Sequence, residues 1–472
     1  MKHKKDLAIV PFDKGQGLVS IERDELVRKA EKEFKNVTLD TKDTTLALQN
    51  NMQGKLRGFK KNDKFDQETY KNLYPSSSVT PTANPAIKAH KPEKDYPARL
   101  ITSHIGAPQE NVASYLNDIL KPFIESNKLV CKNSFDFVER IKSMKVGPFE
   151  KMVSYDATAL FPSVPISDAI KLTRDLLDKD DQLQSRTKLT PEEVTDLISS
   201  CLSSSNFFYN NRHHTQKDSG PIGLSLMVTI SQIWMIFTME QAIARAKSSN
   251  LPVPRVIFIY MDDCWCLIPY RRPGLRNTTN TTDPAVTFND CLNAIHPRVQ
   301  FTREEEVDQS IAFLDVFVTR NSDGTFSTRI FRKPSNTNLT IKPQSCQNPT
   351  TAIACFKGEL CRIHQICSSQ EQIKKEVEFT LNLFEDNGHN RSRLANIAKD
   401  YQPPPYGKRD PDAKSLKTKK KQNNNTVSSN EKLDNLFEIL PFHHEDLTNE
   451  EYKPYVCIPY FRTYRTYIPS PP

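Results

Sequence analysis

Two adjacent carboxylates stand in the middle of an apolar stretch of the sequence. Asp262 and Asp263 lie between residues 256–260 and 264–268, which are rich in the β-branched and aromatic side chains that suit a half-buried strand. We therefore predict a β-hairpin with both aspartates at its turn. Adjacent carboxylates repel each other, so the pair favours a divalent cation, which takes oxygen ligands. A solvated Asp-Asp turn on an ordinary hairpin is the alternative interpretation.

A third carboxylate, Asp156, ends another predicted strand, which begins at Lys151. An aspartate at the end of a buried strand can be a metal ligand. Asp156 can also be a helix cap or a turn residue, which is the alternative interpretation. The aromatic Phe161 stands five residues after Asp156, ahead of a helix that we expect Ser167 to cap.

A glycine-bearing loop precedes the longest apolar segment of the chain. Because only 13 of the 472 residues are glycine, the proximity of Gly220 and Gly223 indicates a local backbone requirement, although an ordinary loop is the alternative. Residues 224–239 are predicted to form a buried helix, since they are too few to span a bilayer comfortably. Upstream, residues 207–210 are expected to form a strand and residues 212–214 a basic surface turn.

Isolated basic side chains occur in the proline-rich, extended residues 81–106. Lys91 and Arg99 either face solvent or bind the triphosphate of a nucleotide. Arginine suits the second task because its planar guanidinium pairs with two phosphate oxygens at once.

The composition fits an intracellular protein that has a polyanionic partner. Lys and Arg number 65 against 57 Asp and Glu, which gives a formal net charge of +8. The ten cysteines lack the Cys-x2-Cys spacing of a zinc site, so we expect reduced, mostly buried thiols. No signal peptide is visible, and the expected localisation is the nucleus, the cytoplasm or both.

Taken in order, these motifs resemble those of reverse transcriptases. Asp156 with Phe161, the Gly220–Gly223 loop and Asp262-Asp263 stand in the order of motifs A, B and C of a polymerase palm. In the details of these and other short motifs, the sequence resembles the Penelope-like retroelement family over roughly residues 6–370. Further family segments are matched by Asp13-Lys14-Gly15, Arg99–Ser103 with Gly106, Phe313–Val316, Arg332-Lys333-Pro334 and Thr337-Asn338.

The sequence departs from this family in two places. Leu224-Ser225 stands where a serine-proline commonly follows the motif B glycine. The Gly-Ile-Tyr…Tyr-Ile-Gly endonuclease that many members carry at the C-terminus is not found. A catalytically decayed, nucleic-acid-binding relative is therefore the alternative function, and a telomerase-like or intron-type polymerase is a third.

The resemblance implies an α/β right-hand polymerase with fingers, a palm built on an antiparallel sheet, and a helical thumb. In that fold the strands of motifs A and C are neighbours, so Asp156 and Asp262 would converge. The implied activity is RNA-directed DNA polymerisation with two Mg²⁺ ions, or Mn²⁺, acting on an RNA template, a DNA primer and deoxynucleoside triphosphates. Phe161 would lie under the sugar and exclude a 2′-hydroxyl, or else would be a core residue.

The resemblance also assigns roles to individual positions. Catalysis falls to the three aspartates, and the metal site adds a neighbouring backbone position. The assignments are Asp156, Asp262 and Asp263 for catalysis; these with Ala157 for metal; Lys91, Arg99, Phe161, Pro221, Gly223 and Tyr260 for the nucleotide; and Gly220, Met261, Arg332 and Lys333 for template and primer.

Five segments are expected along the chain. Residues 1–80 would belong to the fingers side, and residues 81–330 would form fingers and palm, with two strands around an acidic turn at Glu304–Glu306. A helical thumb or helix-turn-helix-like segment would occupy residues 331–400. Residues 401–430 would be a basic, disordered linker, and residues 431–472 the remnant of a connector to the endonuclease, so that the chain would be a fragment.

Overall fold

The computed structural model describes residues 6–404, except 15–16, 35–36, 90, 203, 218–219, 222, 271–282 and 335. The chain divides into two compact units, residues 1–406 and 407–472, and the described residues all belong to the first. The expected linker from residue 405 onward and the expected connector at 431–472 lie outside the described residues.

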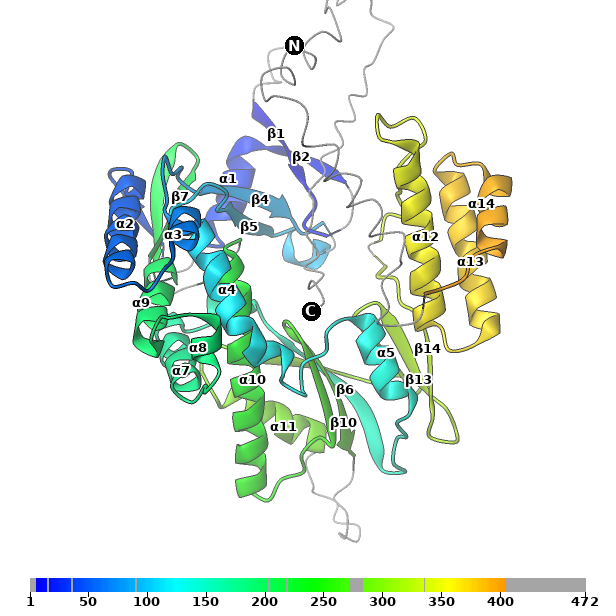
Figure 1. Ribbon diagram of the computed structural model, residues 1–472. Helices are drawn as coiled ribbons and strands as arrows, with labels where there is room; N and C mark the ends of the chain where they lie inside the picture. Colours follow the sequence, from blue (N-terminus) through cyan, green and yellow to red (C-terminus); the bar gives the residue numbers. More distant parts are fainter. Residues whose placement is uncertain are drawn as a thin grey trace, which may run out of the picture. The chain divides into compact units, whose positions relative to one another are not determined.

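One sheet of the described chain, here called the palm sheet, has four antiparallel strands; Figure 1 shows two of them, β6 and β10, side by side in the lower part of the view. Its strands are ordered β11-β6-β10-β9, so the predicted hairpin of β9 and β10 is confirmed. The strand of motif A pairs directly with the strand that follows Asp262. The strand bounds are β6 (Glu150–Ala157), β9 (Val256–Tyr260), β10 (Asp263–Pro269) and β11 (Phe301–Glu305).

After Asp263, strand β10 is apolar because both faces of the palm sheet are covered. Cys264 and Cys266 pack into one buried cluster, whereas Trp265 and Leu267 pack into another. This alternation is the period-two pattern of a strand, and two buried faces explain why it reads as a continuous apolar run.

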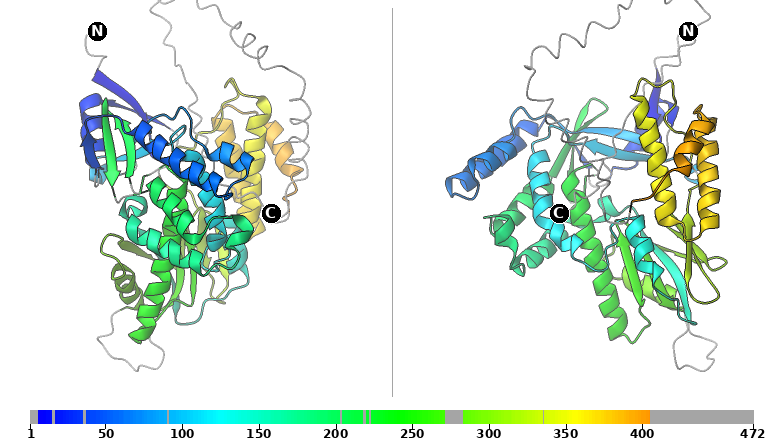
Figure 2. Two further views of the ribbon diagram at one scale, coloured as in Figure 1. Left: turned by 60° about the vertical axis from the view of Figure 1, so that its left-hand side comes forward. Right: turned by 45° about the vertical axis from the view of Figure 1, so that its right-hand side comes forward.

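The first of these clusters is built around α10 (Ser225–Ser248), the helix expected at residues 224–239. It packs beside α4 (Glu110–Glu125), as Figure 2 shows, and beside α11 (Pro284–Asn293). Within the described residues α10 is the one helix long and apolar enough to cross a membrane, but 61% of its most apolar window is buried inside the protein. A helix that is apolar all round and enclosed by neighbours is a core helix, as predicted.

A second, five-stranded sheet, here called the fingers sheet, has the order β3-β8-β7-β4-β5. The hairpin of β1 (Leu7–Pro11) and β2 (Leu18–Glu22) contacts it, followed by α1 (Arg23–Glu31). The strand bounds are β3 (Val37–Asp40), β4 (Thr82–Ile87), β5 (Ala98–Ser103), β7 (Ser204–Tyr209) and β8 (Arg212–Lys217).

The prediction of a basic surface turn at residues 212–214 is wrong. These residues begin β8, and the turn is made by Asn210 and Asn211, whose φ angles of 47° and 59° are tolerated by asparagine. His214 is buried and stacks on Phe207 at 5.1 Å between ring centroids, so it is a core side chain.

Six further helices lie in the connections from β3 to β4 and from β6 to β7. Ser167 does not cap the helix after Phe161, because α7 begins at Ile166 and Pro165 holds the N-cap position. The helices are α2 (Thr45–Lys61), α3 (Gln67–Leu73), α6 (Leu160–Ser163), α7 (Ile166–Asp178), α8 (Leu183–Arg186) and α9 (Pro191–Leu202).

Beyond the palm sheet the chain forms a small three-stranded sheet with β12 (Ser310–Phe313), β13 (Val316–Arg320) and β14 (Phe326–Ile330). The expected acidic turn is therefore wrong, because Glu304 and Glu305 belong to β11 and three strands occupy this region. α5 (Ser134–Lys142) packs against the apolar residues of this small sheet, in the cluster that also holds Trp265 and Leu267.

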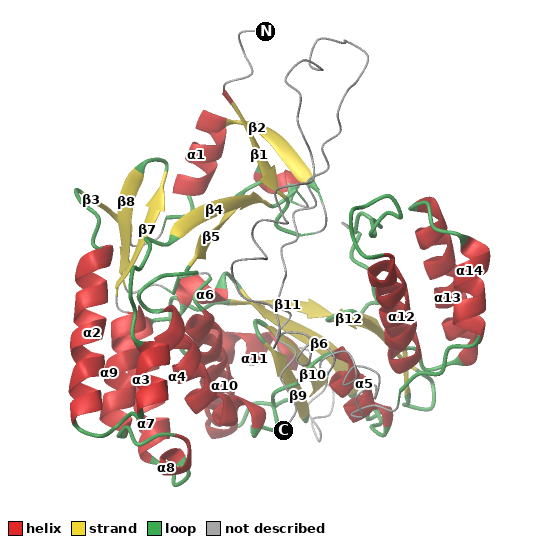
Figure 3. Cartoon of the chain, turned by 45° about the horizontal axis from the view of Figure 1, so that its top comes forward, coloured by secondary structure: helices red, strands yellow, loops and turns green. Residues whose placement is uncertain are grey.

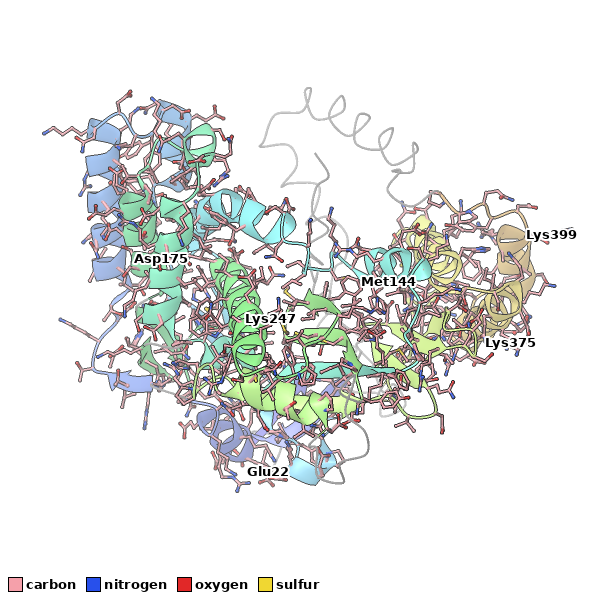
Figure 4. All side chains as sticks on the ribbon, turned by 90° about the horizontal axis from the view of Figure 1, so that it is seen from below. Glu22, Met144, Asp175, Lys247, Lys375 and Lys399 are labelled. Atoms are coloured by element: carbon pink, nitrogen blue, oxygen red, sulfur yellow. The ribbon has the colours of Figure 1, made fainter. Side chains whose placement is uncertain are left out.

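Three helices follow, here called the thumb helices: α12 (Pro349–Ile366), α13 (Gln370–Asp386) and α14 (Arg391–Lys399) (Figure 3). Figure 4 labels Lys375 on α13 and Lys399 at the end of α14. The small sheet holds α12, since Asp315 accepts hydrogen bonds from Arg362, at 2.9 Å, and from Ser134. The Phe-Leu-Asp-Val segment, which contains Asp315, thus links the small sheet to α12 and to α5.

The cysteines of the described residues are free thiols, as expected. Six of them are buried, but Cys346 and Cys355 are exposed.

Candidate active site

Three carboxylates meet at one end of the palm sheet. In the register of β6 and β10, Asp156 stands opposite Asp263, and their side chains are hydrogen-bonded to each other. Asp262 occupies the adjacent hairpin turn, where its backbone carbonyl accepts a hydrogen bond from Ala157 N–H at 3.0 Å. The structure therefore brings together all four residues that the sequence assigned to the metal site.

The negative charge of this group is only partly compensated by nearby cations. Partial burial and the charges of Asp262 and Asp156 raise the pKa of Asp263 to about 7. Burial and Asp262 also raise the pKa of Asp156. A shared proton relieves the repulsion between two such carboxylates, and a divalent cation would relieve it more fully.

The donor set fits a hard, oxygen-seeking cation such as Mg²⁺. In the part of the chain that the structure describes, no three His, Cys, Asp or Glu side chains are already arranged around a metal position. Asp262 is exposed at its turn, so its side chain has room to rotate toward the other two carboxylates.

The hairpin turn itself is strained. Met261 has a φ of 56°, a conformation that residues with side chains rarely adopt and that is often retained at functional sites. Tyr260 pairs with Asp263 across the hairpin, and burial raises the pKa of its half-buried hydroxyl. Both residues therefore border the carboxylates, where the sequence placed them.

Basic side chains from distant segments lie around the carboxylates. Lys14, at the tip of the β1–β2 hairpin, interacts electrostatically with Asp262 and Asp156. Lys333, exposed after β14, interacts with Asp263 and with Lys14. The sequence assigns no role to Lys14; its one signal is the Asp13-Lys14-Gly15 motif.

The other predicted basic residues have different environments. Arg99 of β5 forms an ion pair with Asp13 at 3.3 Å, and Lys91 precedes a 3-10 helix (Pro92–Lys94). Arg332 is engaged within the protein: it forms an ion pair with Glu376 and lies over the ring of Phe379, so it fastens the thumb helices. These contacts do not support the template and primer assignment of Arg332.

The glycine loop is held between α6 and the fingers sheet. A Cβ added at Gly220 would lie 2.6 Å from the carbonyl oxygen of Phe161. One added at Gly223 would lie 1.9 Å from the carbonyl oxygen of Thr102, and Gly223 has a φ of 126°. Pro221 between them is buried. The loop therefore connects Phe161 to the strand that carries Arg99.

No family model matches the chain, and no curated protein matches it. Among solved structures it is similar to telomerase from Candida albicans in complex with a fragment of telomeric RNA (10% identity, TM-score 0.48, 84% of this chain and 64% of that chain). It is also similar to the BmCPV RNA-dependent RNA polymerase at elongation state (13%, 0.41, 84% and 33%) and to the Sicinivirus 3Dpol RNA-dependent RNA polymerase (13%, 0.42, 70% and 70%).

The chain thus spans about a third of the BmCPV polymerase and under two thirds of the telomerase. The predicted α/β fold class is confirmed by the described elements themselves, with a fingers sheet, an antiparallel palm sheet that carries the aspartates and a helical thumb. What the site does is argued below from its own geometry.

We expect Gly223→Ala to destabilise the protein strongly, because the new Cβ would collide with a backbone oxygen at a φ that alanine seldom adopts. Gly358→Ala is the matched control: it lies within α12 with nothing within 4 Å of the added Cβ. It should stabilise the helix by about 0.5–1 kcal/mol. Urea unfolding of both variants measures the difference, and equal stability of the two would contradict the close packing of the loop against Thr102.

Proposed function

We propose that the protein is an RNA-directed DNA polymerase of the Penelope-like retroelement type. The observation that carries this proposal is the placement of Asp156 opposite Asp263 on paired strands, with Asp262 at the adjoining turn. Carboxylates on neighbouring strands of a covered sheet, bordered by basic side chains, suit metal-assisted transfer of a nucleotide.

Asp156, Asp262 and Asp263, with the backbone of Ala157 beside them, would hold two Mg²⁺ ions. When bound, these ions would activate the primer 3′-oxygen and stabilise the leaving pyrophosphate. Asp262, at the turn, would give the site its adjustable ligand, whereas strand pairing fixes the backbone of Asp156 and Asp263.

The remaining roles belong to the surrounding residues. Arg99 and Lys14 would balance the charge of the triphosphate, and Lys333 would approach from the thumb side. The Gly220–Gly223 loop would form the floor under nucleotide and template, since its glycines leave no side chain in the way. We infer that one deoxynucleoside triphosphate would bind among these residues.

An RNA template and a DNA primer are the proposed macromolecular partners, within the nucleus or cytoplasm. With a net charge of +8, the chain would bind them largely through phosphate contacts, so affinity should fall as salt rises. A decayed, nucleic-acid-binding relative is the second candidate, favoured by Leu224-Ser225 in place of serine-proline.

Asp262→Asn should abolish primer extension on an RNA template in Mg²⁺ or Mn²⁺ while RNA binding persists. The substitution removes a metal ligand and leaves the phosphate-binding cations intact. Asp290→Asn is the matched control, because Asp290 is an exposed carboxylate on α11 of the same region. Full extension by Asp262→Asn would refute the site, and an inactive wild-type protein that binds RNA would favour the decayed relative.

Phe161→Val should raise ribonucleotide incorporation if the ring excludes a 2′-hydroxyl. Phe161 is half-buried in α6 and packs against the main core. Its carbonyl oxygen lies beside Gly220, which places the residue near the proposed nucleotide. The measurement is the ratio of kcat/KM for dNTP and NTP. A lower ratio in a folded, active variant supports the gate. An unchanged ratio shows that Phe161 is a core residue, for which Phe161→Ala would cost about 3–5 kcal/mol of stability.

A further inference from the structure

Asp13 is a buried carboxylate at the tip of the N-terminal hairpin. Its side chain is only 2% exposed, and one oxygen, Oδ1, lies 3.3 Å from Nη1 of Arg99. The other oxygen, Oδ2, is buried without a hydrogen-bond partner among the described residues. Burying a carboxylate in this way costs stability unless a partner offsets its charge. For Asp13, the ion pair with Arg99 is that partner.

The backbone, not the carboxylate, attaches this tip to the fingers sheet. Asp13 N–H donates a hydrogen bond to Ile87 O at 2.8 Å, and Phe12 forms a β-bridge with the same residue. The hairpin is also packed through a small apolar cluster of its own that includes Val10, Ile21 and Ile87. The carboxylate is therefore not required to anchor the hairpin.

Among the described residues, Arg99 forms an ion pair with Asp13. Its side chain is 41% exposed although Asp13 is almost fully buried, so part of the guanidinium remains accessible to a ligand. A guanidinium presents five N–H donors in a rigid fork, and a carboxylate on its inner edge fixes the direction of the outer edge.

The cations around Asp13 outnumber it. Burial lowers the pKa of Lys14, and the charges of Lys333 and Arg99 lower it further. Burial likewise lowers the pKa of Lys88; the charges of Glu33 and Asp13 oppose this shift, and those of Arg99 and Lys91 add to it. Like charges gathered beside the catalytic carboxylates are stabilised by a polyanion, and a triphosphate provides one.

We propose that Asp13 is a positioning residue that holds Arg99, and with it the cationic cluster at the hairpin tip, in place for the polyphosphate of the incoming nucleotide. The inference rests on the proposed function. Asp13 itself does not contact the nucleotide. Fixing the arginine in advance lowers the entropy lost on binding, so Asp13 should act on nucleotide affinity more than on the chemical step.

The test compares wild type, Asp13→Asn, Arg99→Ala and the double variant. Asp13→Asn keeps the shape of the side chain and removes its charge. It should raise the KM for dTTP roughly tenfold, the size of one charge-assisted hydrogen bond, with little change in kcat. The inhibition constant of inorganic tripolyphosphate should rise by the same factor. Asp196→Asn, which breaks an exposed ion pair with Lys55, is the matched control and should change neither constant.

The double variant separates positioning from a general structural role. If Asp13 acts through Arg99, the double variant should bind dTTP no more weakly than Arg99→Ala alone, and its losses will not add. Additive losses, or an unchanged KM in Asp13→Asn with normal thermal unfolding, would overturn the inference. Asp13→Glu, which restores the charge, should recover part of the affinity.

A binding measurement keeps this inference separable from the polymerase proposal. Calorimetric titration of tripolyphosphate into each protein requires no catalysis. Binding that depends on Asp13 and Arg99 in a protein without extension activity would support the positioning role and refute polymerisation. Extension activity together with tripolyphosphate binding that ignores Asp13 would refute the positioning role alone.

Discussion

Mutual repulsion of three carboxylates at the end of a sheet covered on both faces is the constraint on which this structure depends. Strand pairing forces Asp156 against Asp263, and the turn keeps Asp262 beside them. Proteins seldom retain such a cost without a function that uses it. The raised pKa values of Asp156 and Asp263 express the same cost, and a cation with phosphate ligands would remove it.

The elements around the three carboxylates hold them in place and supply nearby positive charge. The strand order of the palm sheet and its two apolar clusters hold the aspartates in register. The glycine loop packs against Phe161 at Gly220 and against Thr102 at Gly223. The loop of motif B therefore contacts both the segment of motif A and the fingers sheet. The basic side chains near the carboxylates come from distant parts of the described chain: Lys14 precedes the fingers sheet in sequence, and Lys333 follows the small sheet. These two separate segments would thus supply positive charge to match the charge of the substrate.

Sequence reasoning predicted what local pattern determines. The hairpin around Asp262, the strand ending at Asp156 and the buried helix after Gly223 each follow from apolar periodicity and turn residues within a short window. The aspartates could be expected to meet only because the resemblance supplied the pairing of their strands, which no local pattern contains.

The differences from the sequence-based expectations have identifiable physical causes. A basic turn is expected at residues 212–214, but the two asparagines just upstream adopt the positive φ angles and form the turn. Asp13 and Arg99 belong to different elements, so their ion pair is a product of tertiary packing. Arg332 carries a family motif, yet its partners Glu376 and Phe379 come from α13 and make it part of the thumb packing.

Binding of Mn²⁺ measured by electron paramagnetic resonance tests the central claim most directly. The sample would contain an RNA template, a chain-terminated DNA primer and dTTP, so that phosphate oxygens complete the coordination without turnover. The account predicts protein-dependent Mn²⁺ binding in wild type and in Asp290→Asn, and its loss in Asp156→Asn and Asp263→Asn. Undiminished binding in folded Asp156→Asn and Asp263→Asn would contradict it.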